Sequence, residues 1–127
     1  MRSEESALLA LLERNPHNKM AFELLMAFYL SDGRPDKVVA NLRRLKDFSY
    51  PRVPRHYQEA WVIYTASSDK PPPAPEFELD PEVLRQARTV HRIMAASARP
   101  EDGVRRVWEA GLGDSYFFYS VAGHGRR

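Results

Sequence analysis

The stretch NKMAFELLMAFYLSDGRPDKVVANLRRLKD, residues 18–47, decides the fold of this 127-residue chain. Its first half places large apolar side chains at the i, i+3, i+4 and i+7 spacing of one helix face: Phe22, Leu25, Met26 and Tyr29. Asn18 precedes this helix as a cap, Gly33 ends it, and Pro35 stands in the first turn of a second helix. We therefore expect two antiparallel helices joined by a short turn.

This helical pair resembles the tetratricopeptide repeat, a pair of helices that recurs about every 34 residues. Six positions match the packing pattern of the repeat: Phe22, Leu25, Tyr29, Gly33, Val38 and Leu42. The residue type departs from the repeat at three positions, where Met26, Val38 and Tyr50 replace glycine, alanine and proline, so that Val38 keeps the packing position but not the alanine. The resemblance implies antiparallel pairs stacked as a short right-handed solenoid, with a groove that binds peptides.

A looser resemblance concerns two longer runs, NKMAFELLMAFYL and RLKDFSYPRVPRHYQEA. Together they look like the soluble C-terminal tail of an uncharacterised family of bacterial multi-spanning membrane proteins. That family has no known activity to carry over. The membrane segments that this family would imply are absent from the sequence, and a larger parent protein is one of the alternatives that it leaves open.

Further helices are expected on both sides of the first pair. Upstream, Ser3 introduces EESALLALLER, which ends at Asn15-Pro16. Downstream, Pro54 begins the run RHYQEAWVIYTAS, which repeats the aromatic spacing of residues 18–30. Because Trp61 falls on the packing face of that run, we expect it to be buried between repeats.

Three more helices are expected in the C-terminal part of the chain. Asp80 caps the first, which runs to about Ser97, and Pro100 opens the second, which runs to Gly111. Asp114 is expected to cap the last, SYFFYSVA, for which a strand is the alternative. Its aromatic side chains suggest that it covers an exposed apolar end of the stack.

The pattern of the whole sequence, residues 1–127, therefore predicts a single all-α domain of about seven helices. Its parts are repeat-like helices over 1–67, a proline-rich break over 68–79, C-terminal helices over 80–122 and a frayed tail over 123–127. Hydrophobic residues make up 43% of the chain and charged residues 28%, values at which a core forms without disulfides or metal.

Residues with catalytic or metal-binding patterns are scarce. The chain has no cysteine, no nucleophile elbow and no phosphate-binding loop, and with six glycines it lacks a dinucleotide fingerprint. Its four histidines, His17, His56, His91 and His124, do not show zinc-helix spacing, and His56 with Glu59 comes nearest to it. We therefore expect neither an enzyme nor a metal or cofactor site.

Targeting signals are also absent from the sequence. The N-terminal run has Glu4 and Glu5 where a signal peptide needs positive charge. The longest apolar stretch of the whole chain, MAFELLMAFYL, is shorter than the roughly 20 residues of a membrane span. By default, a cytoplasmic location is expected.

The middle of the chain is locally basic. Residues 34–59 carry seven lysines or arginines against three acids, whereas residues 1–33 carry three against five. Basic residues interleaved with tyrosines are typical of nucleic-acid binding, but the net charge of +2 is small for a protein that neutralises phosphates. A solvent-exposed helix face explains the same pattern.

A protein-interaction or scaffold module is the function that this fold favours most. The first helices of stacked pairs line a concave surface that binds a protein or extended peptide. The candidate residues on that surface and its rim are Lys19, Glu23, Arg52, Arg55, Gln58 and Val62. Because fewer than three repeats are present, self-association through an uncovered end is a further expectation. A groove covered by other segments is the alternative.

Overall fold

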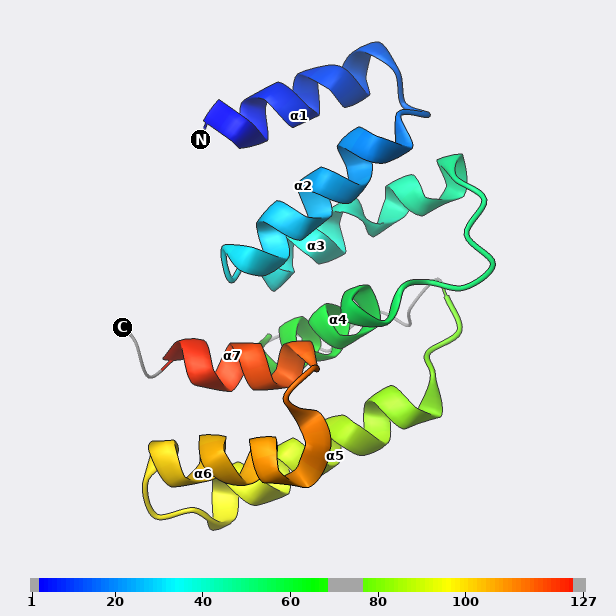
Figure 1. Cartoon of the computed structure of the whole chain (residues 1–127). Coiled ribbons are helices and arrows are strands. Elements are labelled where there is room, and N and C mark those ends of the chain that lie inside the picture. The colour runs from blue at the N-terminus through cyan, green and yellow to red at the C-terminus, as the bar shows by residue number, and fades with distance from the viewer. Residues whose placement is uncertain (1–2, 69–76, 125–127) are drawn as a thin grey trace.

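The computed structural model describes residues 3–68 and 77–124, and these residues form helices and connecting turns with no strand (Figure 1). The elements are α1 (Ser3–Arg14), α2 (Lys19–Ser31), α3 (Pro35–Asn41), the 3-10 helix η1 (Leu42–Asp47), α4 (Arg55–Ser67), α5 (Pro81–Ala96), α6 (Pro100–Val107), the π-helical turn η2 (Trp108–Leu112) and α7 (Tyr116–His124). The predicted all-α class and the number of helices are confirmed. Most of the expected proline-rich break, residues 69–76, lies outside the described residues, as does the end of the tail, 125–127.

Both ends of α2 form as its sequence predicts. The Asn18 side chain accepts a 3.1 Å hydrogen bond from the backbone N–H of Ala21. At the other end Gly33 adopts a φ of 69°, and the Arg34 N–H bonds the carbonyl of Tyr29 at 2.9 Å. This Schellman arrangement needs a left-handed residue, which is why glycine stands at the turn.

The second helix of the pair changes form halfway. α3 ends at Asn41, and the chain continues as the 3-10 helix η1. The buried Asn41 side chain donates a 2.8 Å hydrogen bond to the carbonyl of Lys37, four residues back, and accepts one from Arg44 Nε at 2.9 Å. An asparagine amide that bonds this carbonyl competes with the regular helical ladder, which accounts for the change at this residue.

The C-terminal segment is helical, so the alternative of a strand there was wrong. Ser115, not Asp114, caps α7: its Oγ accepts a 3.1 Å hydrogen bond from the N–H of Phe118. The helix also extends to His124, whereas a frayed tail was expected from residue 123. Upstream of it, Gly111 with a φ of 83° interrupts η2 one residue before its end at Leu112.

The helices pack mostly against their neighbours in the chain, from α1 through to α6 (Figure 1). α7 is the exception, because it returns to lie beside α4 in the middle of the molecule and also contacts α5 and α6. The expectation that this aromatic segment covers an end of the stack was therefore wrong. It covers one side of α4.

Two apolar clusters make up the core, and α4 and α7 join them. The first cluster contains Leu12, Ala21, Phe22, Leu25, Met26, Tyr29, Val38, Tyr57, Ala60 and Tyr116. The second contains Val83, Val90, Val107, Leu112 and Phe117. Since Tyr116 belongs to the first and Phe117 to the second, successive residues of α7 insert into both halves of the core.

Trp61 is less buried than its sequence position predicted. It is half-buried, and its ring meets the edge of Phe77 with centroids 6.1 Å apart. Tyr64, on the same predicted face, is 37% exposed. In place of these residues, the buried turn of α4 consists of Tyr57, Gln58, Glu59 and Ala60, because neighbours enclose that turn from several sides.

Candidate functional site

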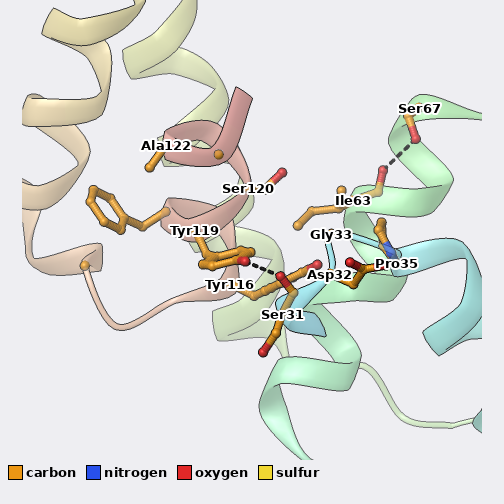
Figure 2. A pocket seen from close by; sticks show the side chains of 13 residues that line it. Ser31, Asp32, Gly33, Pro35, Ile63, Ser67, Tyr116, Tyr119, Ser120 and Ala122 are labelled. Carbon is orange, nitrogen blue, oxygen red and sulfur yellow. Dashed lines mark hydrogen bonds between the residues drawn. The ribbon is translucent and has the colours of Figure 1, made fainter. Parts of the chain in front are cut away.

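A groove of about 630 Å³ lies between α7 on one side and the α2–α3 turn with α4 on the other (Figure 2). We call it the α7 groove. Its lining residues are Ser31, Asp32, Gly33, Pro35, Ile63, Ser67, Gly113, Tyr116, Phe118, Tyr119, Ser120, Ala122 and Gly123. Both its size and its mixture of aromatic, aliphatic and hydroxyl side chains are typical of a binding site.

The walls of the α7 groove are joined at Tyr119. Its hydroxyl donates a hydrogen bond to the backbone carbonyl of Ser31, at the end of α2 (Figure 2). The Tyr119 ring stacks on the Tyr116 ring with centroids 5.6 Å apart and planes 15° apart. Tyr116 is buried, and this burial raises its pKa to about 12, whereas Tyr119 stays 46% exposed. The stacked pair therefore has one buried ring and one ring at the surface.

A buried carboxylate holds α7 in this position. The Glu59 side chain is 0% exposed, and its Oε1 accepts hydrogen bonds from the backbone N–H of Tyr116 at 3.0 Å and from His56 Nδ1 at 2.7 Å. Arg55 Nε donates to Oε2 at 3.3 Å. A negative charge at the N-terminus of α7 is favourable for the helix dipole, and the three donors satisfy a carboxylate that burial would otherwise penalise.

A second cavity of about 270 Å³ adjoins the α7 groove and shares Ser31, Gly113, Tyr116 and Tyr119 with it. It is also lined by His56 and Asp114. The His56 side chain is 54% exposed, while its Nδ1 is held by Glu59. The imidazole therefore has a fixed orientation at the rim of this cavity.

Acidic side chains are the charged groups of the two cavities. Asp32 lines the larger and Asp114 the smaller, and the imidazole of His56 also lines the smaller. Among the residues that the structure describes, neither lining contains a lysine or an arginine. This side of the molecule thus differs from the overall composition, which is slightly basic.

Three of the predicted site residues have internal roles. Gln58 is buried; its amide donates to the Val53 carbonyl at 3.0 Å, and its Oε1 accepts from the Asp80 N–H at 2.8 Å. Val62 packs against the second core cluster. Arg55 bonds Glu59 and also donates to Gln86 Oε1 on α5.

The other three predicted residues are exposed and lie away from the α7 groove. Lys19 and Glu23 sit at the start of α2 and both contact Tyr50: Lys19 Nζ lies 4.6 Å from the ring centre, and Glu23 accepts the tyrosine hydroxyl at 2.8 Å. Arg52 is exposed in the segment before α4. The structure thus brings Lys19 and Glu23 together, but at the opposite end of α2 from Ser31.

The basic segment 34–59 is largely occupied by internal contacts. Arg34 binds both carboxylate oxygens of Asp36, at 3.1 and 2.9 Å, and Lys37 Nζ lies 2.7 Å from the buried Glu5 carboxylate. Arg44 and Arg55 bond Asn41 and Glu59, as described above. Of its seven cations, this leaves three exposed residues, Arg43, Lys46 and Arg52.

The described residues offer neither a metal-binding cluster nor a helix suited to cross a membrane. Within 3–68 and 77–124, no group of three or more histidine or acidic side chains lies close enough to hold a metal ion. His17 bonds the Asp47 carbonyl at 3.2 Å, and His91 is exposed. In the described part of the chain, no helix has both the length and the apolar character that crossing a membrane requires.

Sequence reasoning missed the α7 groove because α7 meets α4 and α2 only through tertiary contacts. No short-range pattern relates Tyr119 to Ser31, which lie 88 positions apart in the chain. The aromatic density of SYFFYS was a signal that this segment packs against something. The number of aromatic residues does not indicate which surface of the chain this segment packs against.

Comparison with known proteins identifies the family. A sequence profile matches residues 1–123, so the chain belongs to a family of unknown function, DUF6057. No curated protein and no solved structure matches the chain.

Proposed function

We propose that this chain is a non-catalytic protein-interaction module that holds a peptide segment of another protein in the α7 groove. The observation that supports the proposal is the groove itself, about 630 Å³ in volume and bounded by parts of four helices, α2, α3, α4 and α7. A groove of this size accommodates several side chains of an extended peptide.

The lining suits a peptide in both its apolar and its polar parts. Ile63, Phe118 and the two tyrosines offer apolar and aromatic surface, which supplies most of the affinity at protein interfaces. Serine hydroxyls at positions 31, 67 and 120 stand beside this surface. Hydroxyls of this kind can pair with the backbone groups of an extended chain, which need partners when they leave water.

Hydrogen bonds hold both walls of the α7 groove in position. Glu59 fixes the start of α7, and Tyr119 bonds the end of α2. Preorganised walls reduce the ordering cost of binding. The sequence resemblance implies that α2 and α4 are the first helices of repeat-like pairs, whose exposed faces form a binding surface. In this chain α7 covers part of that surface on α4 and leaves the α7 groove beside it.

The proposal is tested by selection from a library of displayed peptides on the purified chain. Ser120→Trp places a large side chain in the α7 groove, and Ala95→Trp is the matched control on an exposed part of α5. We expect peptides that bind the wild type and the Ala95→Trp chain but lose binding to Ser120→Trp. Peptides that bind all three chains equally, or nucleic acid as the sole retained ligand, would overturn the proposal.

A further inference from the structure

α1 lies at one end of the stack of helices and packs on α2 (Figure 1). Its inner face is firmly attached: Leu12 is buried, and the buried Glu5 carboxylate accepts hydrogen bonds from Tyr29 and Lys37. These contacts fix which side of α1 faces the core, and therefore which side faces outward.

The outward side of α1 carries a regular stripe of four residues. Glu4, Ala7, Leu11 and Arg14 follow one another at spacings of three, four and three positions, and all four are exposed. Residues at these spacings lie along one side of a helix. The acidic residue stands in the first turn, the two apolar residues in the middle and the basic residue in the last turn. We call this stripe the α1 face.

Exposed aliphatic side chains are concentrated at this end of the molecule. Within residues 3–68 and 77–124, six large apolar side chains are exposed, and three of them lie on α1 and α2, which pack together. These three are Leu11, which is 42% exposed, Met20 and Leu24, and the other three are aromatic. Apolar side chains grouped in this way are typical of a surface that meets another protein.

The α1 face is complementary to itself when two copies of the helix pair in antiparallel orientation. Glu4 then lies opposite Arg14 of the second copy, and Leu11 lies opposite Ala7 of the second copy. The small alanine allows the two helix axes to approach closely, so the leucine can pack against it. Two-fold symmetry repeats both contacts.

The opposite orientation is disfavoured. In a parallel pair, Glu4 would lie opposite Glu4 and Arg14 opposite Arg14, so like charges would meet at both ends. The helix dipoles also favour the antiparallel pair, because each N-terminus then lies beside a C-terminus. The order of charges along α1 therefore specifies one orientation.

We infer that the α1 face binds the α1 face of a second copy of this chain in antiparallel orientation and so forms a two-fold symmetric dimer. Apolar contacts around Leu11 supply most of the affinity, whereas the exposed Glu4–Arg14 pairs mainly fix the orientation. Since a pair of 12-residue helices buries a small area, the dimer is weak and forms as the protein is concentrated. The described residues that line the α7 groove come from positions 31–123, so this inference does not depend on the proposed function.

The test is sedimentation velocity of the purified chain over a range of concentrations. We expect the mean mass to rise from that of one chain toward that of two. Leu11→Glu should weaken the association at least about tenfold, because it places two carboxylates in the apolar centre of the interface. The matched control is Ala95→Glu, at an exposed position on α5, which should associate as the wild type does. Ser120→Trp, which fills the α7 groove, should do so too.

Charge reversal tests the orientation of the two helices. Glu4→Arg alone, or Arg14→Glu alone, should weaken the dimer about three- to tenfold, because each change puts like charges opposite each other twice. The double variant Glu4→Arg/Arg14→Glu places opposite charges together again and should recover most of the affinity. A double variant as weak as the single ones would refute the antiparallel arrangement.

The remaining results also decide. A chain that stays a monomer at every concentration would overturn the inference. So would an association that Leu11→Glu and both single reversals leave unchanged, or one that is lost in Ser120→Trp instead. If Leu11→Glu disturbs folding, the charge reversals still decide, because Glu4 and Arg14 are exposed.

Discussion

The buried carboxylate of Glu59 on α4 accepts a 3.0 Å hydrogen bond from the backbone N–H of Tyr116, the first residue of α7 and 57 positions away. Through this contact a side chain in the middle of the molecule caps a helix near the end of the chain. It fixes the position of α7 and thereby one wall of the α7 groove.

Replacing this carboxylate should destabilise the fold strongly. Glu59→Ala leaves the Tyr116 N–H without its partner and opens a cavity between α4 and α7. We expect the free energy of unfolding to fall by about 3 kcal/mol, measured by denaturant unfolding. The matched control is Glu109→Ala, since Glu109 is 59% exposed and its ion pair with the exposed Arg105 is long, at 3.8 Å. That change should stay within about 0.5 kcal/mol, and equal effects would contradict the role of Glu59.

A second buried carboxylate should make the fold sensitive to acid. Glu5 accepts hydrogen bonds of 2.7 Å from Lys37 Nζ and from the Tyr29 hydroxyl, and these lower its pKa below the ordinary value of 4.5, the lysine contributing most. A lowered folded-state pKa contributes stability that is complete above the unfolded-state value and is lost as the pH falls through the folded-state value.

Glu5→Gln isolates this contribution. We expect the wild type to lose stability below a pH of about 4.5 as the Glu5 carboxylate protonates, and the variant to lose less over the same range. Thermal unfolding followed at several acidic pH values measures the difference. Parallel pH profiles for the two chains would show that Glu5 is not the group responsible.

Buried tyrosines should act in the opposite pH range. Burial raises the pKa of Tyr57 and of Tyr116 to about 12, from an ordinary value of 10. The contribution of these two tyrosines to stability is therefore constant below a pH of 10 and falls between 10 and 12, where tyrosines ionise in the unfolded chain but not in the folded one.

The variant Tyr116→Phe removes one of these groups. It should flatten the alkaline fall in stability by up to about 3 kcal/mol, because each pKa unit corresponds to about 1.4 kcal/mol. Unfolding monitored from neutral to strongly alkaline pH checks this. An unchanged alkaline slope would mean that Tyr116 ionises in the folded protein as it does in the unfolded chain.

Alanine substitutions at two glycines of the C-terminal region distinguish the effect of backbone strain on stability from the effect of packing. A Cβ at Gly111 or at Gly123 meets no atom within 4 Å, yet only Gly111 has a positive φ, of 83°. Gly111→Ala should cost about 1 kcal/mol from backbone strain alone, and Gly123→Ala, within α7, should be neutral or slightly stabilising. Melting temperatures of the two variants test this, and equal shifts would refute the turn geometry at Gly111.

The sequence predicted the helices well because their signals are local. Asn18, Gly33 and Asp80 act through neighbouring backbone groups, and the structure shows each in the expected place. The apolar stripe of residues 22–29 is buried as the helical period predicts. The prediction was wrong where two neighbouring residues suit the same role. At the N-terminus of α7, Asp114 and Ser115 are both suitable caps, and the structure has Ser115.

The α7 groove was not predictable in the same way, since it depends on contacts between residues far apart in the chain. Glu5 and Glu59 are ordinary surface residues by sequence, and only the fold surrounds them with donors. Gln58 and Val62 were expected on a binding surface because α4 was treated as a helix with one packed face. The return of α7 and the start of α5 enclose α4 on further sides.

The most direct test of the account is to map a peptide obtained by selection on the purified chain by its effect on backbone amide NMR signals. We predict that the changes concentrate at Ser31, Asp32 and Gly33 and along α7, Tyr116–His124, and that they are absent from the Ser120→Trp variant. Changes centred on residues 43–52, or spread evenly over the molecule, would contradict the assignment of the α7 groove as the binding site.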